Sequence, residues 1–267
     1  MDNILNARRQ RLPTIALIVA LCWSNFTIAQ LDEDNNQMAW LSFSLNKRIN
    51  KDWSVSYSQL NSIATDEMKI NFIQSNFKVS RKLAKYFYWN VGYKPTFRLN
   101  TTREGQQKVF HRLYTELQYT QKAGAFRFQH KLGGEHNFTP ITKFQQRFYY
   151  SLKAYYKNND LPWKLRPYIT QKLLYYSGGN AIPVEVFDDG EVEEISTNGL
   201  HAYRATIGIR MSPSDRVNVS IYYMRQFEFN ATFLGGEPLN VMNIETGRIA
   251  APFYNFGVIG ISTSFKF

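Results

Sequence analysis

The chain has 267 residues, of which 44% are apolar and 20% are charged, so its composition excludes a disordered protein and allows one large β domain. Aromatic residues reach 16%, a level that suits either a soluble β-sandwich or a protein at a membrane–water interface. The formal net charge is +11, but the Lys and Arg residues are spread singly along the chain, which argues against a nucleic-acid-binding patch.

The first segment has the pattern of a secretory signal peptide over residues 1–29. Three arginines near the start precede an apolar run from Ile15 to Cys22, which is too short for a stable transmembrane helix. Thr27-Ile28-Ala29 supplies small residues before a cleavage point at Gln30. A retained anchor, a twin-arginine signal and lipidation are alternatives that the flanking residues disfavour.

Removal of this segment defines the rest of the chain. The only cysteine, Cys22, leaves with the signal, so the mature protein has no disulfide and no thiolate metal site. A short polar lead is expected over residues 30–37, followed by one domain over residues 38–267.

Alternation of apolar and polar residues dominates this domain. In the segment 143–157, Phe148 and Leu152 share one face, whereas Arg147 and Lys153 share the other. Because successive side chains of a strand point in opposite directions, this period of two predicts β-strands with one apolar face. We expect strands near residues 38–47, 52–61, 69–81, 86–99, 108–121, 125–138, 143–157, 162–176, 199–211, 216–230 and 253–267.

The connections alternate between tight and long. The longest are 177–198 and 231–252, and short turns alternating with long loops are typical of bacterial outer-membrane barrels. The sequence therefore predicts an all-β fold: a single antiparallel transmembrane β-barrel of about 10–12 strands. Eleven strands are counted, although such barrels usually have an even number, so either a weak strand is missed within 232–244 or one strand is split wrongly.

The last segment alternates from Ile259 to Phe267, and the sequence stops on this aromatic residue. Such an ending resembles the signal that the barrel-assembly machinery recognises, and the alternative is an ordinary final strand that happens to end in Phe. Together with the signal peptide, it favours the outer membrane of a Gram-negative bacterium, with the membrane lipid and the assembly machinery as partners.

Several segments resemble a known family. They are Met38-Ala39-Trp40, the turn from Lys47 to Trp53, Phe126 to Leu132, and Gln146 to Tyr150. Together they are similar to the Bacteroidota outer-membrane barrel proteins grouped as domain of unknown function 2490. The resemblance spans about 40–267 and implies a location and a fold, but no activity and no site residues.

The polar faces of the strands carry most of the basic residues. The candidates for lining a lumen are Arg112, Arg127, Lys131, Arg147, Lys153, Arg166, Arg204, Arg210, Glu116 and Glu135, and Lys164, Lys172 and Glu228 share the pattern. In a narrow barrel, such residues form a salt-bridged plug; in a wider one, they line a pore that prefers anions. We expect the plug, and an anionic solute is a candidate partner.

No motif predicts a catalytic, cofactor-binding or metal-binding residue. His201 follows Ser196 closely, which leaves a membrane-embedded lipid hydrolase or acyl-modifying barrel enzyme as the alternative function. His111, His130 and His201 fall on apolar faces by alternation. The acidic run 188–194 favours a solvated loop over a calcium site. The leading expectation is a non-enzymatic barrel with a structural, binding or small-pore role.

Overall fold

The computed structural model describes residues 36–267, except for residues 67, 100–108, 142, 158–160, 186–191 and 232–235. The expected signal peptide at 1–29 lies outside the described residues. The first strand begins at Asn36, inside the segment expected to be the polar lead. Within the described part, no helix has the length and apolarity needed to span a bilayer.

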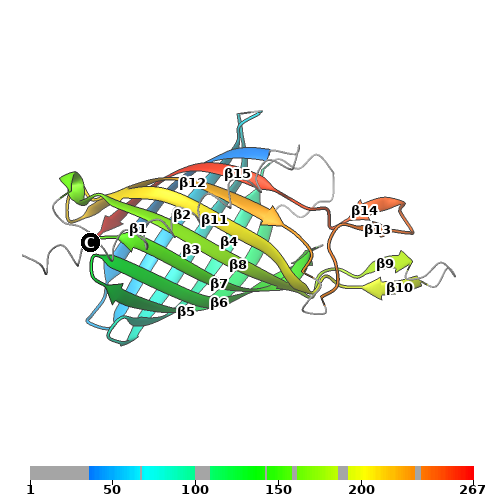
Figure 1. Ribbon diagram of the computed structural model, residues 1–267, viewed down its shortest axis with the longest axis horizontal. Helices are drawn as coiled ribbons and strands as arrows, with labels where there is room; N and C mark the ends of the chain where they lie inside the picture. The colour runs from blue at the N-terminus through cyan, green and yellow to red at the C-terminus, as the bar shows by residue number, and fades with distance from the viewer. Residues whose placement is uncertain are drawn as a thin grey trace, which may run out of the picture. The chain divides into compact units, whose positions relative to one another are not determined.

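Eleven strands form one closed barrel (Figure 1). They are β1 (Asn36–Arg48), β2 (Trp53–Ala64), β3 (Lys69–Ala84), β4 (Phe87–Arg98), β5 (Val109–Ala123), β6 (Phe126–Ile141), β7 (Phe144–Tyr156), β8 (Arg166–Ser177), β11 (Gly199–Met211), β12 (Val217–Glu228) and β15 (Phe256–Lys266). Each strand pairs with the next barrel strand along the chain, and β15 pairs with β1 to close the barrel. The all-β barrel is confirmed, with a strand at each of the eleven expected places.

The barrel is not wholly antiparallel, and here the expectation was wrong. β1 pairs with β15 in parallel, from Asn36 opposite Phe256 to Asn46 opposite Lys266. When strands alternate up and down, an odd number makes the first and the last run in the same direction. The backbone amide of Phe267 also donates to the carbonyl of Asn46 at 3.0 Å, so this seam is hydrogen-bonded to its end.

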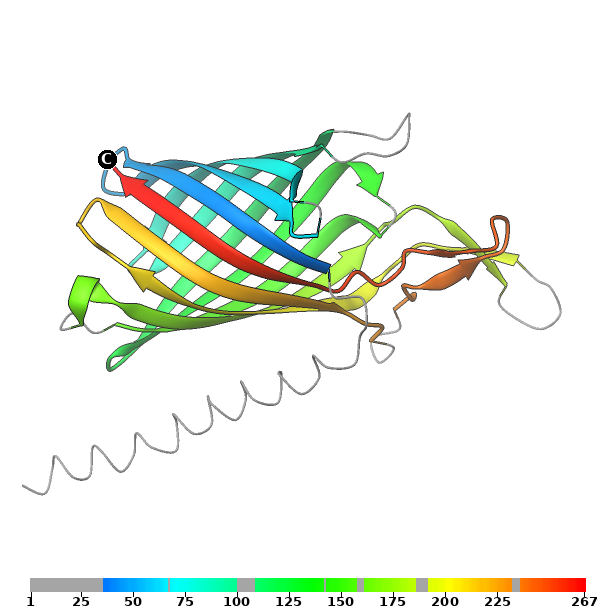
Figure 2. The same cartoon turned by 90° about the horizontal axis from the view of Figure 1, so that it is seen from above.

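The two ends of the barrel differ (Figure 2). At the end where β15 finishes, called here the short-turn end, the connections are 49–52, 85–86, 124–125, 157–165 and 212–216. The first of these turns is held by Asn50, whose Oδ1 accepts hydrogen bonds from the amides of Asp52 and Trp53, both at 2.9 Å. The opposite end is called the long-loop end.

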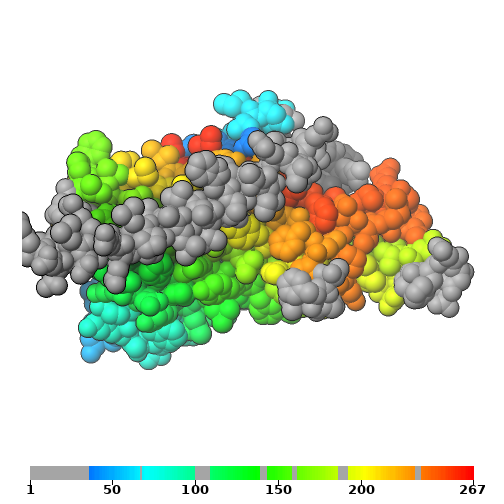
Figure 3. Space-filling view, viewed as in Figure 1, coloured from blue at the N-terminus to red at the C-terminus, as the bar shows by residue number. Residues whose placement is uncertain are grey.

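Two of the long loops carry hairpins of their own. β9 (Ile182–Glu185) pairs with β10 (Val192–Ile195), and β13 (Val241–Asn243) pairs with β14 (Arg248–Ala250). The space-filling view shows them as projections beyond the barrel wall (Figure 3). The weak strand suspected within 232–244 thus exists in part, but it belongs to a hairpin and not to the barrel.

The outward face of the barrel is apolar. Leu41, Ile261, Ile221 and Ile209 stand in one register across β1, β15, β12 and β11, and each side chain is between 44% and 49% exposed. Phe148 and Ile207 are also exposed. Bare aliphatic side chains in a continuous row across four strands are unusual on a protein surface that faces water.

Inside the barrel, tyrosine rings lie over glycines of the neighbouring strand. Gly133 of β6 stands opposite Tyr149 of β7, and a Cβ placed at Gly133 would lie 2.6 Å from the Tyr149 ring. In the same way, a Cβ placed at Gly208 would lie 2.7 Å from the ring of Tyr168. Gly133 therefore lies within β6 and lets a bulky inward ring pack against the wall.

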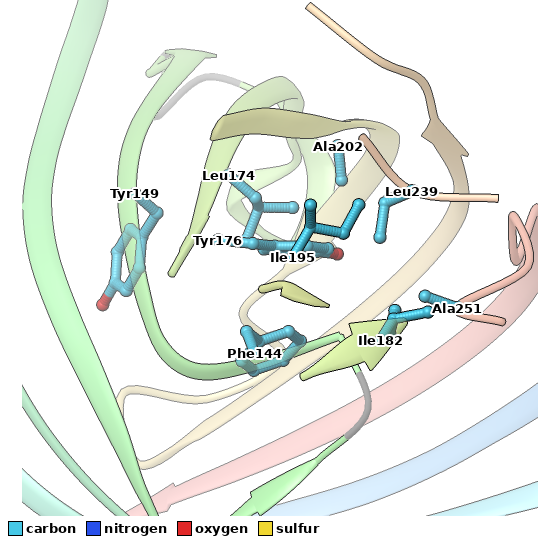
Figure 4. Close-up of a cluster of buried hydrophobic side chains, with 9 residues drawn as sticks. All are labelled: Phe144, Tyr149, Leu174, Tyr176, Ile182, Ile195, Ala202, Leu239 and Ala251. Carbon is cyan, nitrogen blue, oxygen red and sulfur yellow. The ribbon is translucent and has the colours of Figure 1, made fainter. Parts of the chain in front are cut away.

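An apolar cluster packs the long loops onto the barrel at the long-loop end (Figure 4). Its members are Phe144, Tyr149, Leu174, Tyr176 and Ala202 from barrel strands, and Ile182, Ile195, Leu239 and Ala251 from the loops. The ring centroids of Phe144 and Tyr176 are 4.6 Å apart. Strict alternation from Phe148 would place Phe144 on the outward face. It is buried instead, because the β6–β7 pairing shifts register between His136 and Ile141, next to it.

Candidate functional site in the barrel lumen

The inward face of β4 to β7 holds a buried charge network centred on Glu135. This carboxylate accepts hydrogen bonds from Arg147 Nε at 3.0 Å and Nη2 at 2.5 Å. It also accepts from Arg112 Nη1 and Lys94 Nζ, each at 3.2 Å. Arg112 Nε donates to Asn137 Oδ1 at 2.9 Å. One acid, 2% exposed at its side chain, thus binds three cations from three strands.

A second network surrounds Glu116. Its Oε1 accepts from Lys131 Nζ at 3.0 Å and from Asn90 Nδ2 at 2.9 Å. Its Oε2 accepts from the hydroxyl of Tyr149 at 2.9 Å. The ring of Tyr149 reaches this position across Gly133, so the glycine is part of the arrangement that satisfies the carboxylate.

A third network lies at the long-loop end around Glu228. This residue forms a short ion pair with Lys143 and accepts from the hydroxyl of Tyr176 at 3.0 Å. The backbone amide of Tyr254 donates to it at 2.8 Å. Because Tyr176 also belongs to the apolar cluster, this glutamate joins the polar lumen to the cap formed by the loops.

Other inward cations are balanced by aromatic rings or neutral groups. Lys172 Nζ lies 3.6 Å from the centre of the Tyr149 ring, and Lys153 Nζ lies 3.6 Å from that of Tyr168. Such contacts stabilise a cation through the negative face of the ring. Arg204 donates to the side-chain carbonyl of Gln226. The inward face therefore carries more cations than the acids of these networks neutralise.

A cavity of about 680 Å³ opens at the short-turn end. It is lined by Asn46, Lys47, Arg48, Asn50, Lys51, Asp52, Trp53, Ser54, Lys82, Tyr88, Arg210, Ser264, Lys266 and Phe267. Six of the described lining side chains are cationic, and one, Asp52, is a carboxylate. Arg210 is the only one of the ten lumen candidates from the sequence among these lining residues.

The structure brings five of the sequence candidates together in the networks described above: Arg112, Lys131, Arg147, Glu116 and Glu135. Arg127 instead bends back to its own turn, where Nη1 donates to the carbonyls of Gly124 and Phe126. Arg166 stands opposite Arg210 across β8 and β11. Lys153 and Arg204 make the aromatic and amide contacts given above.

Lys164 was expected on the polar face of a strand, and this was wrong. It ends the short 3-10 turn η2 (Pro162–Lys164), which interrupts the strand pattern ahead of β8. Its ammonium pairs with Asp215 at 2.6 Å on the surface of the short-turn end, and this hydrogen bond holds the pKa of the Asp215 carboxyl below its usual value.

The sequence reading missed Lys94, Lys143 and the inward tyrosines. Lys94 follows Asn90 and Gly92 at intervals of two in β4, so the same alternation would have placed it inside. Lys143 precedes β7 and belongs to a loop, where alternation gives no information. The tyrosines escaped notice because an aromatic residue suits the outward face equally well.

Two of the histidines contact tyrosine hydroxyls. His111 Nδ1 contacts the hydroxyl of Tyr93 at 2.5 Å and His130 Nδ1 that of Tyr150 at 2.8 Å, with both rings exposed. His201 was expected on an apolar outward face but is buried, because a bulge between Leu200 and Ala202 shifts the alternation.

His201 is held by local contacts. Its Nδ1 lies 3.2 Å from the carbonyl oxygen of Phe229, and the hydroxyl of Ser196 donates to Gly179 instead. Within the described residues, no three His, Cys, Asp or Glu side chains are grouped for a metal ion. Residues 188–191 of the acidic run lie outside the described part, and Glu193 and Glu194 belong to β10.

Comparison with known proteins identifies a family but no activity. No curated protein matches the chain. A family model described as "Protein of unknown function (DUF2490)" matches residues 37–234, which extend from β1 to beyond the end of β12. The resemblance seen in the sequence is thereby confirmed at the level of the family, and the chain belongs to the DUF2490 family.

Proposed function

We propose that this protein is an outer-membrane β-barrel of a Gram-negative bacterium, closed to solute flow and non-enzymatic, with a structural or binding role. The observation that carries the proposal is the exposed row of Leu41, Ile261, Ile221 and Ile209. Burying apolar area is favourable by about 25 cal/mol per Å², so such a row belongs against lipid tails or another apolar surface.

The dimensions of the barrel support a membrane location. Its strands have 11 to 16 residues, and a tilted strand of about 9–11 residues crosses the hydrocarbon core of a bilayer. Closure removes free strand edges, so the backbone groups of the wall are paired as an apolar environment requires. By analogy with other bacterial barrels, the short-turn end faces the periplasm and the long-loop end faces outward.

Two features support a closed lumen. The networks of Glu135 and Glu116 occupy the inward face of the four adjacent strands β4 to β7, and Lys143, next to β7, pairs with Glu228 of β12. The apolar cluster with Ile182, Ile195 and Leu239 holds the loops on its long-loop end. Residues that bind one another are not free to coordinate a passing ion, so we expect little conductance.

The proposed partners are the membrane lipid and the barrel-assembly machinery. The exposed isoleucines of β15, Ile259 and Ile261, suit lipid contact. The C-terminal strand ends next to β1 at the parallel seam, where the last pairing of the barrel must form. A variant without Phe267 is expected to assemble less efficiently than the full chain.

Fractionation of cells tests the location, and planar bilayers test the function. The protein is expected in the detergent-extracted outer membrane, with heat-modifiable migration on gels and no steady conductance of porin size. Recovery as a soluble periplasmic protein would contradict the membrane barrel. Turnover of phospholipid or lipid A that is lost on His201→Ala would instead establish the hydrolase alternative.

A further inference from the structure

Two arginines face each other inside the barrel without an acidic partner. Arg166 of β8 and Arg210 of β11 are directly opposite in the register, and their charges lie close enough to interact. The Nε atoms of both are buried and have no hydrogen-bond partner. Like charges in directly opposed positions destabilise a sheet, so this pair costs stability unless something neutralises it.

Further cations surround this pair. Lys153 of β7 lies close enough to Arg210 for their charges to interact, and its ammonium rests on the ring of Tyr168. Lys82 and Lys266 line the cavity together with Arg210. Positive side chains from β3, β7, β8, β11 and β15 thus converge on the short-turn end of the lumen.

The inward acids are engaged elsewhere. Glu135 binds Arg147, Arg112 and Lys94, and Glu116 binds Lys131. Glu228 lies at the long-loop end, on Lys143. Of the described residues that line the cavity, Asp52 alone has a carboxylate side chain. Arg166 and Arg210 thus have no acidic partner among these described side chains, so an anion from solution can supply the compensating charge.

The opposite wall provides room and hydroxyl groups. Ser54 and Ser264 line the cavity, and Ser44 contributes another hydroxyl that contacts Asn46. The lining of the 680 Å³ space also includes long basic side chains, among them Lys82 of β3, Arg210 of β11 and Lys266 of β15. Guanidinium groups facing hydroxyl groups form a set of donors that suits the oxygens of a phosphate.

We propose that the short-turn cavity binds a multivalent anion with phosphate groups, held at the inner end by Arg210, which lines the cavity, and by its neighbours Arg166 and Lys153. The multiple cations favour a ligand with several charges over a simple halide. The site is defined by the barrel itself and does not depend on the membrane location. If the proposed orientation holds, it opens toward the periplasm.

Calorimetric titration of the full chain in uncharged detergent, with inorganic pyrophosphate as the probe, tests the site. Saturable binding that weakens with added salt is expected. Arg166→Gln and Arg210→Gln should each weaken it by about tenfold or more, because each removes a charge-assisted hydrogen bond. Lys164→Gln is the matched control, since Lys164 lies at the same end but pairs with Asp215 on the surface.

A second arm separates a soluble phosphate compound from a lipid headgroup. Pyrophosphate is titrated into the protein in nanodiscs of phosphatidylcholine alone and of phosphatidylcholine with phosphatidylglycerol. Unchanged affinity identifies a soluble ligand. A weaker apparent affinity in the anionic discs identifies headgroup binding. If the headgroup binds at the same site, Arg210→Gln should abolish this difference between the two kinds of disc.

Two results would overturn the site. One is the absence of saturable pyrophosphate binding to the wild type at low salt. The other is an equal loss of affinity in Lys164→Gln and in the two arginine variants, which would indicate a diffuse charge effect. Heat-modifiable migration of each variant shows that it is folded, so a loss of binding cannot be attributed to misfolding.

Discussion

Glu135 and Arg147 lie opposite each other on β6 and β7, and the carboxylate of the first accepts two hydrogen bonds from the guanidinium of the second. Arg112 and Lys94 also bind this carboxylate, so one acid offsets part of the charge of three cations. Further along the lumen, Arg166 and Arg210 stand opposite each other with no acid between them. Removing the charge of Glu135 should therefore lower the stability of the barrel, whereas removing the charge of Arg210 should raise it.

Glu135→Gln is expected to destabilise the barrel by about 3–5 kcal/mol, because it leaves three buried cations without a counter-charge. Urea unfolding in lipid vesicles, followed by tryptophan fluorescence, measures the free energy of unfolding. Glu193→Gln is the matched control, since Glu193 is exposed on β10 outside the barrel. Equal stability of the two variants would mean that the Glu135 network contributes nothing to the free energy of unfolding.

Arg210→Gln is expected to raise the stability of the ligand-free barrel, since it relieves repulsion from Arg166. The expected gain is of the order of 0.2–1 kcal/mol, the size of a cross-strand pair. Arg147→Gln should lower stability under the same conditions because it removes two hydrogen bonds to Glu135. Added pyrophosphate should stabilise the wild type more than Arg210→Gln, through its preferential binding to the folded state.

Ile221→Arg tests whether the exposed aliphatic row contacts lipid. A cation placed near the middle of a lipid-facing strand costs about 2–4 kcal/mol in an outer-membrane barrel. Val192→Arg is the control, because Val192 is also an exposed apolar residue but lies on β10, outside the wall. A small and similar effect of both substitutions on unfolding in vesicles would place Ile221 in water.

Gly133→Ala is expected to disturb the Glu116 network, although no charged residue is changed. The new methyl group would lie 2.6 Å from the Tyr149 ring and displace the hydroxyl that donates to Glu116. Gly134→Ala is the neighbouring control, with its nearest ring atoms at 3.3 Å on Phe148. Thermal unfolding should show a larger loss for Gly133→Ala than for Gly134→Ala, and a loss in Tyr149→Phe as well.

The sequence predicted the wall of the barrel better than its interior. Alternation is a local property of each strand, so Phe148 and Ile207 could be assigned to the exposed face without knowledge of the neighbours. Where the backbone departs from regular pleating, the same argument fails. The bulge at His201 and the turn at Lys164 each shift the alternation; Pro162 marks the turn, whereas the residue types at the bulge follow the strand pattern.

Pairing across the barrel was beyond the reach of the sequence. Glu116 and Lys131 are 15 residues apart and meet only because β5 and β6 have a particular register. The cavity at the short-turn end requires residues from both ends of the described chain, such as Asn46 and Lys266, to meet at the parallel seam. That seam follows from an odd number of strands, and eleven was the number that the alternation gave.

The final prediction concerns the cap at the long-loop end. Ile182 and Ile195 pack on Phe144 and Tyr176, so they hold the β9–β10 hairpin on the barrel. Replacing residues 180–196 with a short Gly-Ser linker is expected to open this end and to produce conductance in planar bilayers that the wild type lacks. The current should favour anions, because the lumen carries more cations than acids.

Two variants complete this experiment. Shortening the β13–β14 turn at residues 245–246 changes a loop of the same end but removes neither a residue of the apolar cluster nor Ile244, which bonds to Pro183, so no conductance is expected. Adding Arg147→Glu and Arg204→Glu to the cap-deleted protein should reduce its anion preference, since both side chains face inward. Steady conductance of porin size in the wild type would refute the closed lumen. A cap-deleted barrel that still fails to conduct would show that the Glu135 and Glu116 networks close the lumen alone.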